Sequence, residues 1–341
     1  MNRSHTVRYT LLFTLGIGAL LLIFAMNVTM GSVEISLGDV ARAITTPQEL
    51  PRATVSIIRN IRLPRVLAAL LGGSCLAVSG IMLQVFFGNP IVEPYILGIS
   101  SGSTLFLGLV ILGGYTFGMT TITAMGMFIG SFIGAMLVMV LVIFASQKVK
   151  SVTTLLIIGM MLGYVCSACT SVLTVLADRE KIAAFSMWTM GSFAGFKWEH
   201  VRLLYEVAVP FLLLAFLISK QLNAMLLGEK YAQSMGISIK PFRFLMVTVS
   251  SVLTAIVTAF AGSISFVGLA VPHIVRSLFK TSDNRIILPG SMIFGAIMAG
   301  LCDLVARLIL SPIEIPLGAV TSLIGAPIVV YLLVRQRKGE M

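Results

Sequence analysis

Long apolar runs with few charged residues follow one another along almost the whole chain. About 20 consecutive apolar residues cross the hydrocarbon layer of a membrane as one helix. Residues 94–147 form a run long enough for two helices, with a hairpin predicted near Gly113-Gly114 and Gly118. The runs that fit one helix each cover residues 9–33, 66–92, 151–177, 203–219, 242–262, 264–278, 286–305 and 315–334. The pattern predicts an all-α membrane protein with about ten transmembrane helices in one domain over residues 1–341.

Composition agrees with a chain that lies mostly in lipid. Hydrophobic residues make up 57% of the sequence and charged residues 11%, and the mean hydropathy is +1.02. Soluble domains carry about 25% charged residues, so a water-soluble core of this size is excluded. The net charge of +11 does not indicate nucleic acid, because the basic residues lie between the apolar runs and form no stripe interleaved with aromatic residues.

The distribution of Lys and Arg indicates the orientation, because these residues are enriched in cytoplasmic segments. Ten helices place both termini on one side, and the segments on that side hold the larger share of the 24 Lys and Arg residues. We therefore expect cytoplasmic N- and C-termini. Residues 31–65 then form an unusually basic outer segment, which ends with Arg62-Leu-Pro-Arg65 at the start of a span.

Three interruptions of the apolar pattern carry most of the functional information. Residues 88–94 form a proline-punctuated inner turn with a lone carboxylate, Glu93. Residues 220–243 form the longest polar inner segment, and apolar residues among its charges favour short amphipathic helices outside the bilayer. Glycine and proline break the span over residues 262–276, which is tolerated at membrane depth only where protein or a cavity satisfies the freed backbone groups.

These features together resemble the FecCD-type permeases of ABC importers, and the resemblance covers nearly the whole chain. Six motifs occur in the order found in that family. They are Arg62–Gly80, Gln84 with Asn89-Pro90 and residues 94–102, Gly228–Gly236, Phe266–Arg276 with Pro272-His273, Asp303 with Arg307, and Ile315–Pro327.

The resemblance implies a BtuC-like fold of ten helices per subunit in a bacterial inner membrane. It also implies a homodimer, or a pair with a paralogous permease, above two cytoplasmic ATPase subunits. A substrate-binding protein outside the cytoplasm would deliver the cargo, which in this family is a ferric siderophore, haem or cobalamin. No nucleic acid partner is expected, and membrane lipid surrounds the subunit.

Arg62, Arg65 and Arg307 match the family's outer arginines, which pair with acidic residues on the binding protein. Guanidinium groups suit bidentate contacts with carboxylates. The alternative is that they snorkel to the interface, as many arginines at helix ends do. Asp303 precedes Arg307 by four residues on one predicted helix, so we expect these two side chains to pair.

The inner segment resembles the family's coupling helices, which contact the ATPase subunits. The resemblance assigns contacts to Glu229, Lys230 and Tyr231, with turns at Gly228 and Gly236. The sequence contains no G-x-x-x-x-G-K-[ST] phosphate-binding loop. We therefore expect that this chain is not an enzyme and that a partner hydrolyses ATP.

Ser151, Thr153 and Thr154 lie where relatives have a gate at the inner end of the fifth helix. Serine and threonine also cap helix N-termini, so gating and capping remain equal alternatives. Met160 and Met161 could line a path, but packing in the bundle is the favoured interpretation.

Asn89, Pro90, Pro272 and His273 belong to the family motif whatever the cargo, so we expect structural roles for them. No second metal-ligating side chain is placed beside His273 by the sequence, and neither a metal site nor a cofactor is expected. Cys75, Cys166, Cys169 and Cys302 all fall inside apolar spans, where buried packing is the favoured interpretation.

Two other classes of function compete with the importer permease. A secondary transporter or channel for a small solute would need ionisable residues within the spans for ion coupling, and only Asp303 and Arg307 approach that requirement. A membrane enzyme would need clustered catalytic side chains at one interface, and the sequence shows none. The cargo, the homodimer or heterodimer state and the residues that line the path are not fixed by the sequence.

Overall fold

The computed structural model describes residues 3–31, 33–95, 98–113, 124–149, 152–311 and 313–337, and in these ranges the chain forms helices and no strands. Short π-helical stretches, η2 and η3, cover Ile57–Arg62 and Leu109–Gly113, and a 3-10 turn, η1, covers Pro47–Glu49. The α-helices are α1 (Arg3–Thr29), α2 (Leu37–Thr45), α3 (Arg52–Ser56), α4 (Leu63–Phe87), α5 (Ile99–Gly108), α6 (Ala124–Lys148), α7 (Val152–Leu176), α8 (Arg179–Thr189), α9 (Trp198–Leu217), α10 (Ser219–Leu226), α11 (Glu229–Ser234), α12 (Ile239–Ala261), α13 (Val267–Phe279), α14 (Asn284–Leu308) and α15 (Leu317–Arg337).

Among the described residues, seven helical segments are long and apolar enough to cross a membrane, and three shorter apolar helices accompany them. The shorter ones cover Ile99–Leu112, Val267–Phe279 and Leu317–Tyr331. These ten segments correspond one by one to the ten spans predicted from the apolar runs. The hairpin expected near Gly114 and Gly118 lies outside the described residues.

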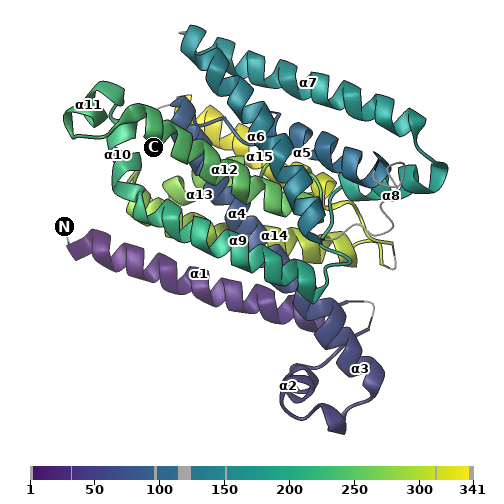
Figure 1. Ribbon diagram of the computed structural model, residues 1–341. Coiled ribbons are helices and arrows are strands. Elements are labelled where there is room, and N and C mark those ends of the chain that lie inside the picture. Colours follow the sequence, from purple (N-terminus) through teal and green to yellow (C-terminus); the bar gives the residue numbers. More distant parts are fainter. Residues whose placement is uncertain are drawn as a thin grey trace.

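The helices form one bundle around α4 and α12, which are the most buried of the long spans, whereas α1 and α7 lie at its margins. Figure 1 shows α10 and α11 at the same end of the bundle as both marked termini. Helices α2, α3 and α8 lie at the opposite end. This arrangement agrees with an even number of crossings. We call the end with α10 and α11 the inner end and the other the outer end.

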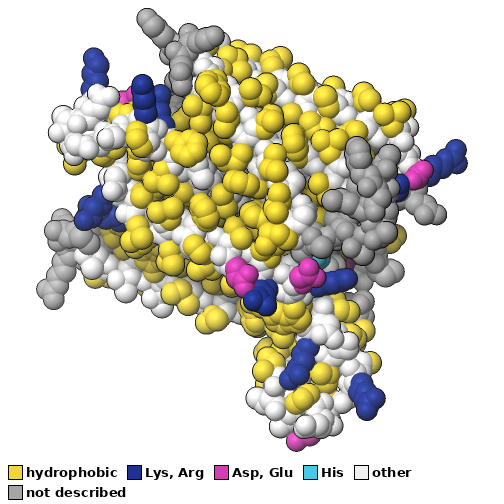
Figure 2. All heavy atoms as spheres, in the orientation of Figure 1, with side chains coloured by type: hydrophobic (Ala, Val, Ile, Leu, Met, Phe, Trp, Pro, Cys, Tyr) yellow, Lys and Arg dark blue, Asp and Glu magenta, His cyan; other side chains and the backbone are white. Residues whose placement is uncertain are grey.

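Figure 2 shows apolar side chains over most of the visible face, with Lys and Arg gathered mainly at its two ends. Exposed leucine, isoleucine and valine side chains occur along α1, α6 and α7. An apolar belt between two charged margins is what a bundle that spans a bilayer requires.

Glycine pairs let the central helices touch along their backbones. A Cβ atom on Gly80 would lie 1.9 Å from the carbonyl oxygen of Gly268, and one on Gly73 would lie 2.1 Å from that of Gly295. In α6, a Cβ on Gly134 would lie 2.1 Å from the carbonyl oxygen of Gly102 in α5. Such contacts are typical of membrane bundles, where small residues allow close packing without a hydrophobic driving force.

Several boundaries differ from the sequence-based expectation. The outer segment over residues 31–65 is largely helical, and α3, η2 and α4 run without a break from Arg52 to Phe87. At the inner end, α12 already begins at Ile239, because Pro241 is tolerated in the first turn of a helix. Helix α8 was not predicted, since its charged first turn hides it from a search for apolar runs.

A small second apolar core supports the outer end. Val28, Val40 and Ile58 are buried in it together with Ile35 and Ala43. It joins α2 to the end of α1 and to the π-helical turn η2. The outer segment that carries α2 and α3, seen below the bundle in Figure 1, is therefore anchored by packed apolar side chains.

Three of the four cysteines are buried, as expected, but Cys169 is exposed on α7, and all four are free thiols. The expectation for Cys169 was wrong because α7 contacts few neighbours and leaves much of its surface open.

Candidate functional site

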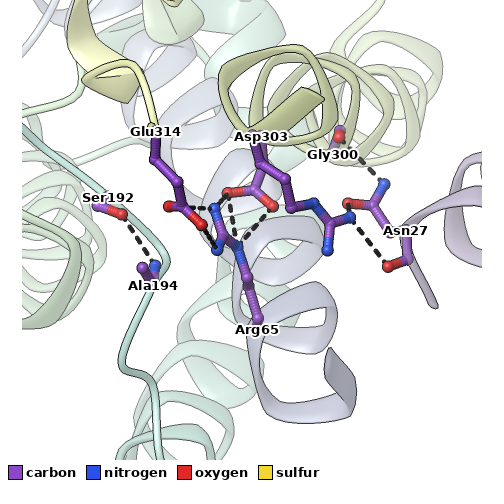
Figure 3. A network of polar contacts seen from close by, with 8 residues as sticks. Asn27, Arg65, Ser192, Ala194, Gly300, Asp303 and Glu314 are labelled. Atoms are coloured by element: carbon purple, nitrogen blue, oxygen red, sulfur yellow. Dashed lines mark hydrogen bonds and ion pairs between the residues drawn. The ribbon is translucent and has the colours of Figure 1, made fainter. Parts of the chain in front are cut away.

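At the outer end, Arg65 of α4 lies between two carboxylates from distant parts of the chain. Its Nε and Nη2 atoms donate to Asp303 of α14 at 2.9 to 3.1 Å. Its Nη1 and Nη2 atoms donate to Glu314, in the loop between α14 and α15, at 2.7 and 3.0 Å. Figure 3 shows the guanidinium group held between the two carboxylates. Arg65 is thus paired on two edges, the strongest geometry available to arginine.

The pair expected between Asp303 and Arg307 is wrong. The Asp303 carboxylate accepts hydrogen bonds from Arg65, while Nη2 of Arg307 donates to the backbone oxygen and the Oδ1 atom of Asn27 at 2.9 and 3.0 Å. Asn27, near the end of α1, in turn donates to the carbonyl oxygen of Gly300 at 3.1 Å. The four-residue spacing allowed a pair, but buried partners from α4 and α1 compete for both side chains.

Arg62 turns inward and neither snorkels nor faces outward. It is buried, and its guanidinium group donates to the carbonyl oxygens of Val28 and Thr29 at 2.6 Å and also to that of Val33. These carbonyls lie at and just beyond the end of α1, where a helix leaves backbone acceptors without partners. Arg62 therefore ties the end of α1 to the start of α4.

The contact with Arg65 lowers the pKa of Glu314, because a carboxylate is stabilised by the guanidinium hydrogen bonds. Its side chain is 41% exposed, whereas that of Asp303 is 1% exposed. The cluster thus contains one carboxylate that water cannot reach, Asp303, and one that water can reach, Glu314.

Glu314 also borders a hollow of about 360 Å³ at the outer end. Apolar side chains from α8, the segment after it, α12 and the loop before α15 supply most of the wall, including Trp188, Met190 and Phe260. The backbone N–H groups of Leu317 and Gly318 donate to the carbonyl oxygens of Gly191 and Met190 at 2.9 and 3.3 Å. The loop that carries Glu314 is therefore joined to the segment after α8.

On the inner side, the expected structural motif residues meet in space. His273 of α13 lies with its Nε2 atom 2.9 Å from the carbonyl oxygen of Pro90. The Asn89 side chain accepts from the backbone N–H of Ile91 at 3.0 Å, an arrangement that closes a turn. Pro272 lies within α13, next to His273. The turn after α4 is thus fastened to α13.

Glu93 provides a second link between this turn and α13. The side chain is 3% exposed, and its Oε2 atom accepts from the backbone N–H of Phe266 at 3.0 Å. Phe266 has a positive φ of 67° at the start of α13, where the span is broken as predicted. Burial raises the pKa of Glu93 to about 7. A carboxylate at a helix N-terminus is favoured by the helix dipole.

The predicted coupling segment contains the two short helices expected there, α10 and α11. Gly228 and Gly236 flank α11 with φ values of 106° and 84°, which only glycine adopts without strain. Lys230 and Tyr231 point outward. Glu229 pairs with Arg243 of α12, whose guanidinium carbon lies 5.8 Å from the ring centre of Phe86. Arg243 was not identified from the sequence.

Apolar side chains are exposed on α10 and α11 and directly beside them. Leu227 and Met235 are 67% and 60% exposed, and Leu226 and Tyr231 are also open. An exposed apolar cluster rimmed by polar residues is typical of a protein interface.

The predicted gate is only partly described. Ser151 lies outside the described residues, and α7 begins at the next residue, Val152. Thr153 lies in the first turn, where its side chain is not described, and Thr154 is exposed there. The choice between gating and capping stays open.

Within the described residues, no three His, Cys, Asp or Glu side chains are arranged to hold a metal ion. The important residues missed from the sequence are Asn27, Glu314 and Arg243. Asn27 and Glu314 were missed because their partners, Arg307 and Arg65, lie far away in the chain. Arg243 was missed although Glu229 lies only 14 positions before it.

Comparison with known proteins identifies the family. The model of the FecCD transport family matches residues 19–335. The haemin transport system permease protein HmuU of Yersinia pestis is 34% identical over 94% of this chain and 94% of its own length. The vitamin B12 import system permease protein BtuC of Klebsiella pneumoniae is 36% identical over 82% of this chain and 83% of its own.

The fold agrees with that assignment. A solved metal-chelate type ABC transporter in an inward-facing conformation superposes with a TM-score of 0.82 and 33% sequence identity, covering 96% of this chain and 99% of the other. The resemblance inferred from the six motifs is thereby confirmed, as is the all-α, BtuC-like membrane fold. This chain belongs to the FecCD transport family of ABC transporter permeases.

Proposed function

We propose that this chain is the permease subunit of a binding-protein-dependent ABC importer in a bacterial inner membrane. It would form the path for an iron chelate, haem or cobalamin into the cytoplasm, powered by separate ATPase subunits. The observation that carries this proposal is the match over 96% of the chain to a metal-chelate type ABC transporter. HmuU and BtuC, named for haemin and vitamin B12, support a large chelate or macrocycle as cargo.

At the inner end, α10 and α11 would contact the ATPase. Exposed Leu227, Tyr231 and Met235 offer an apolar contact surface, with Lys230 at its edge and Glu229 anchored by Arg243. Movement of α11 would pass to α12 through the Glu229–Arg243 pair and to the end of α4 through Phe86.

At the outer end, the binding protein would dock around Arg65 and Arg307. Arg62 would support this surface from beneath, because its own guanidinium group is occupied by the carbonyls that end α1. Acidic side chains on the binding protein are the matching chemistry, since arginine prefers bidentate carboxylates.

A second permease copy, identical or paralogous, would complete the path. Helix α7 supports this arrangement, because it packs on α5 and α6 and leaves Tyr164, Val172 and Val175 exposed. Ser151, Thr153 and Thr154 would form the inner gate near the start of this helix. Both chain termini would lie in the cytoplasm, at the end that holds α10 and α11.

Co-purification and reconstitution test the proposal. The permease should purify with an ATPase subunit, and proteoliposomes with both should take up haemin, a ferric siderophore or cyanocobalamin when ATP and the binding protein are supplied. A variant with Tyr231→Glu should insert into the membrane normally but no longer purify with the ATPase subunit. Retention of the ATPase by this variant would contradict the placement of the coupling surface.

A further inference from the structure

The Arg65 guanidinium group has no open edge for an incoming carboxylate. Asp303 occupies the edge formed by Nε and Nη2, and Glu314 occupies the edge formed by Nη1 and Nη2. A partner's carboxylate can therefore reach Arg65 only by replacing one of the two residues that already hold it.

We infer that Glu314 is an internal competitor of the binding protein: it occupies Arg65 in the free permease and gives way to a carboxylate of the docking partner. The inference rests on the proposed function, because it assumes that docking uses Arg65. It assigns to Glu314 a part in setting the affinity for the partner, which neither the family match nor the sequence motifs supply.

The two carboxylates differ in their freedom to leave. Asp303 is buried within helix α14, and its side chain is 1% exposed. Glu314 lies in the loop between α14 and α15, and its side chain is 41% exposed. The Glu314 side chain can therefore rotate into the solvent without loss of helical structure. Asp303 would stay hydrogen-bonded to Arg65 and keep its guanidinium group oriented.

The exchange also avoids the main cost of opening a buried ion pair. Breaking such a pair leaves an unpaired charge buried away from water, and the free-energy cost of that state is high. Replacement of one carboxylate by another keeps the guanidinium group paired throughout. The displaced carboxylate becomes hydrated, and the site accepts only partners that bring a matching negative charge.

Displacement of Glu314 would reach the outer hollow directly. Glu314, Ile315 and Pro316 line that hollow. The backbone N–H of Leu317 just beyond them donates to the carbonyl oxygen of Gly191, and that of Ile315 donates to the carbonyl oxygen of Ala306. Release of Glu314 would thus move a charged side chain at the edge of the hollow, while these backbone hydrogen bonds keep the wall itself in place.

The test is the affinity of nanodisc-embedded permease–ATPase complex for the ligand-free binding protein encoded with it. Glu314→Ala removes the competitor, so a larger fraction of the permease is ready to bind, and we expect the Kd to fall about fivefold or more. Glu314→Asp should lie between Glu314→Ala and the wild type. The matched control is Glu206→Gln, which removes an exposed arginine–glutamate pair on α9 and should leave the Kd unchanged.

The outcomes separate the inference from the proposed function. If the wild type binds the binding protein and Glu314→Ala binds equally well or more weakly, with an unchanged melting temperature, the competitor role is overturned while the importer function stands. If Arg65→Glu and the wild type bind equally well, docking does not use Arg65 and both the docking site and the inference fail. A Kd lowered by Glu314→Ala and raised by Arg65→Glu supports the exchange.

Discussion

Arg65 and Glu314 lie 249 positions apart in the chain and form two parallel hydrogen bonds, Nη1 to Oε1 at 2.7 Å and Nη2 to Oε2 at 3.0 Å. The pair joins the start of α4 to the loop before α15. Asp303 pairs with the other edge of the guanidinium group. Arg65, which was predicted to face outward, is therefore buried between two carboxylates.

Asp303→Asn should destabilise the fold far more than Glu314→Gln. Removal of one partner from a buried ion pair costs about 3–5 kcal/mol, and Asp303 is fully buried against Arg65. Thermal unfolding of the purified variants in detergent measures this difference. Equal melting temperatures for Asp303→Asn and Glu314→Gln would show that the buried edge contributes no more than the exposed one.

Glu93 should make stability depend on pH near neutrality. Burial raises its pKa from 4.5 to about 7, so the folded state binds the proton more tightly than the unfolded state does. The stability gained from the protonated carboxyl is complete below pH 4.5 and is lost as pH rises through about 7, by roughly 3 kcal/mol in all.

Melting curves from pH 5 to pH 8.5 for the wild type and Glu93→Gln test this dependence. The wild type should lose stability with rising pH relative to the variant, which cannot titrate at this position. A constant difference between the two curves across the whole range would mean that Glu93 ionises normally in the fold.

Gly80→Ala should prevent assembly of the central bundle. The added Cβ would lie 1.9 Å from the Gly268 carbonyl oxygen, a backbone atom that cannot move without shifting α13. The control is Gly18→Ala, since a Cβ there meets nothing within 4 Å. We expect folded, monodisperse protein from Gly18→Ala and almost none from Gly80→Ala. Comparable yields would contradict the backbone contact between α4 and α13.

Gly236→Val should uncouple ATP hydrolysis from transport. A Cβ at Gly236 meets no neighbour, but its φ of 84° is unfavourable for a β-branched residue, so the turn after α11 would change. The expected result is ATPase activity that persists while uptake falls severalfold, measured on the same proteoliposomes. Full uptake in this variant would argue against a coupling role for α11.

The membrane spans could be predicted from the sequence because hydropathy is a local property. The apolar runs identified each of the ten membrane segments, including the short one at Val267–Phe279 that follows a broken span. Hydropathy requires no knowledge of which helices become neighbours.

Side-chain partners could not be predicted in the same way. Asp303 had a suitable neighbour four residues on, at Arg307, but pairs with Arg65, which lies 238 positions away. Arg62 lies three residues before Arg65 and carries the same charge. It nevertheless donates to carbonyl oxygens at the end of α1 and, within the described part of the chain, to no carboxylate. Tertiary packing decides which of several possible partners a side chain meets, and a single sequence does not show that packing.

The central claim is that this chain is a passive permease that moves cargo only when a loaded binding protein and an ATP-hydrolysing partner act on it. Uptake of radiolabelled cargo into proteoliposomes, with each component omitted in turn, tests that claim most directly. The account predicts uptake only from the complete set with ATP. Uptake by the purified chain alone, driven by an ion gradient or by the cargo's own gradient, would contradict it.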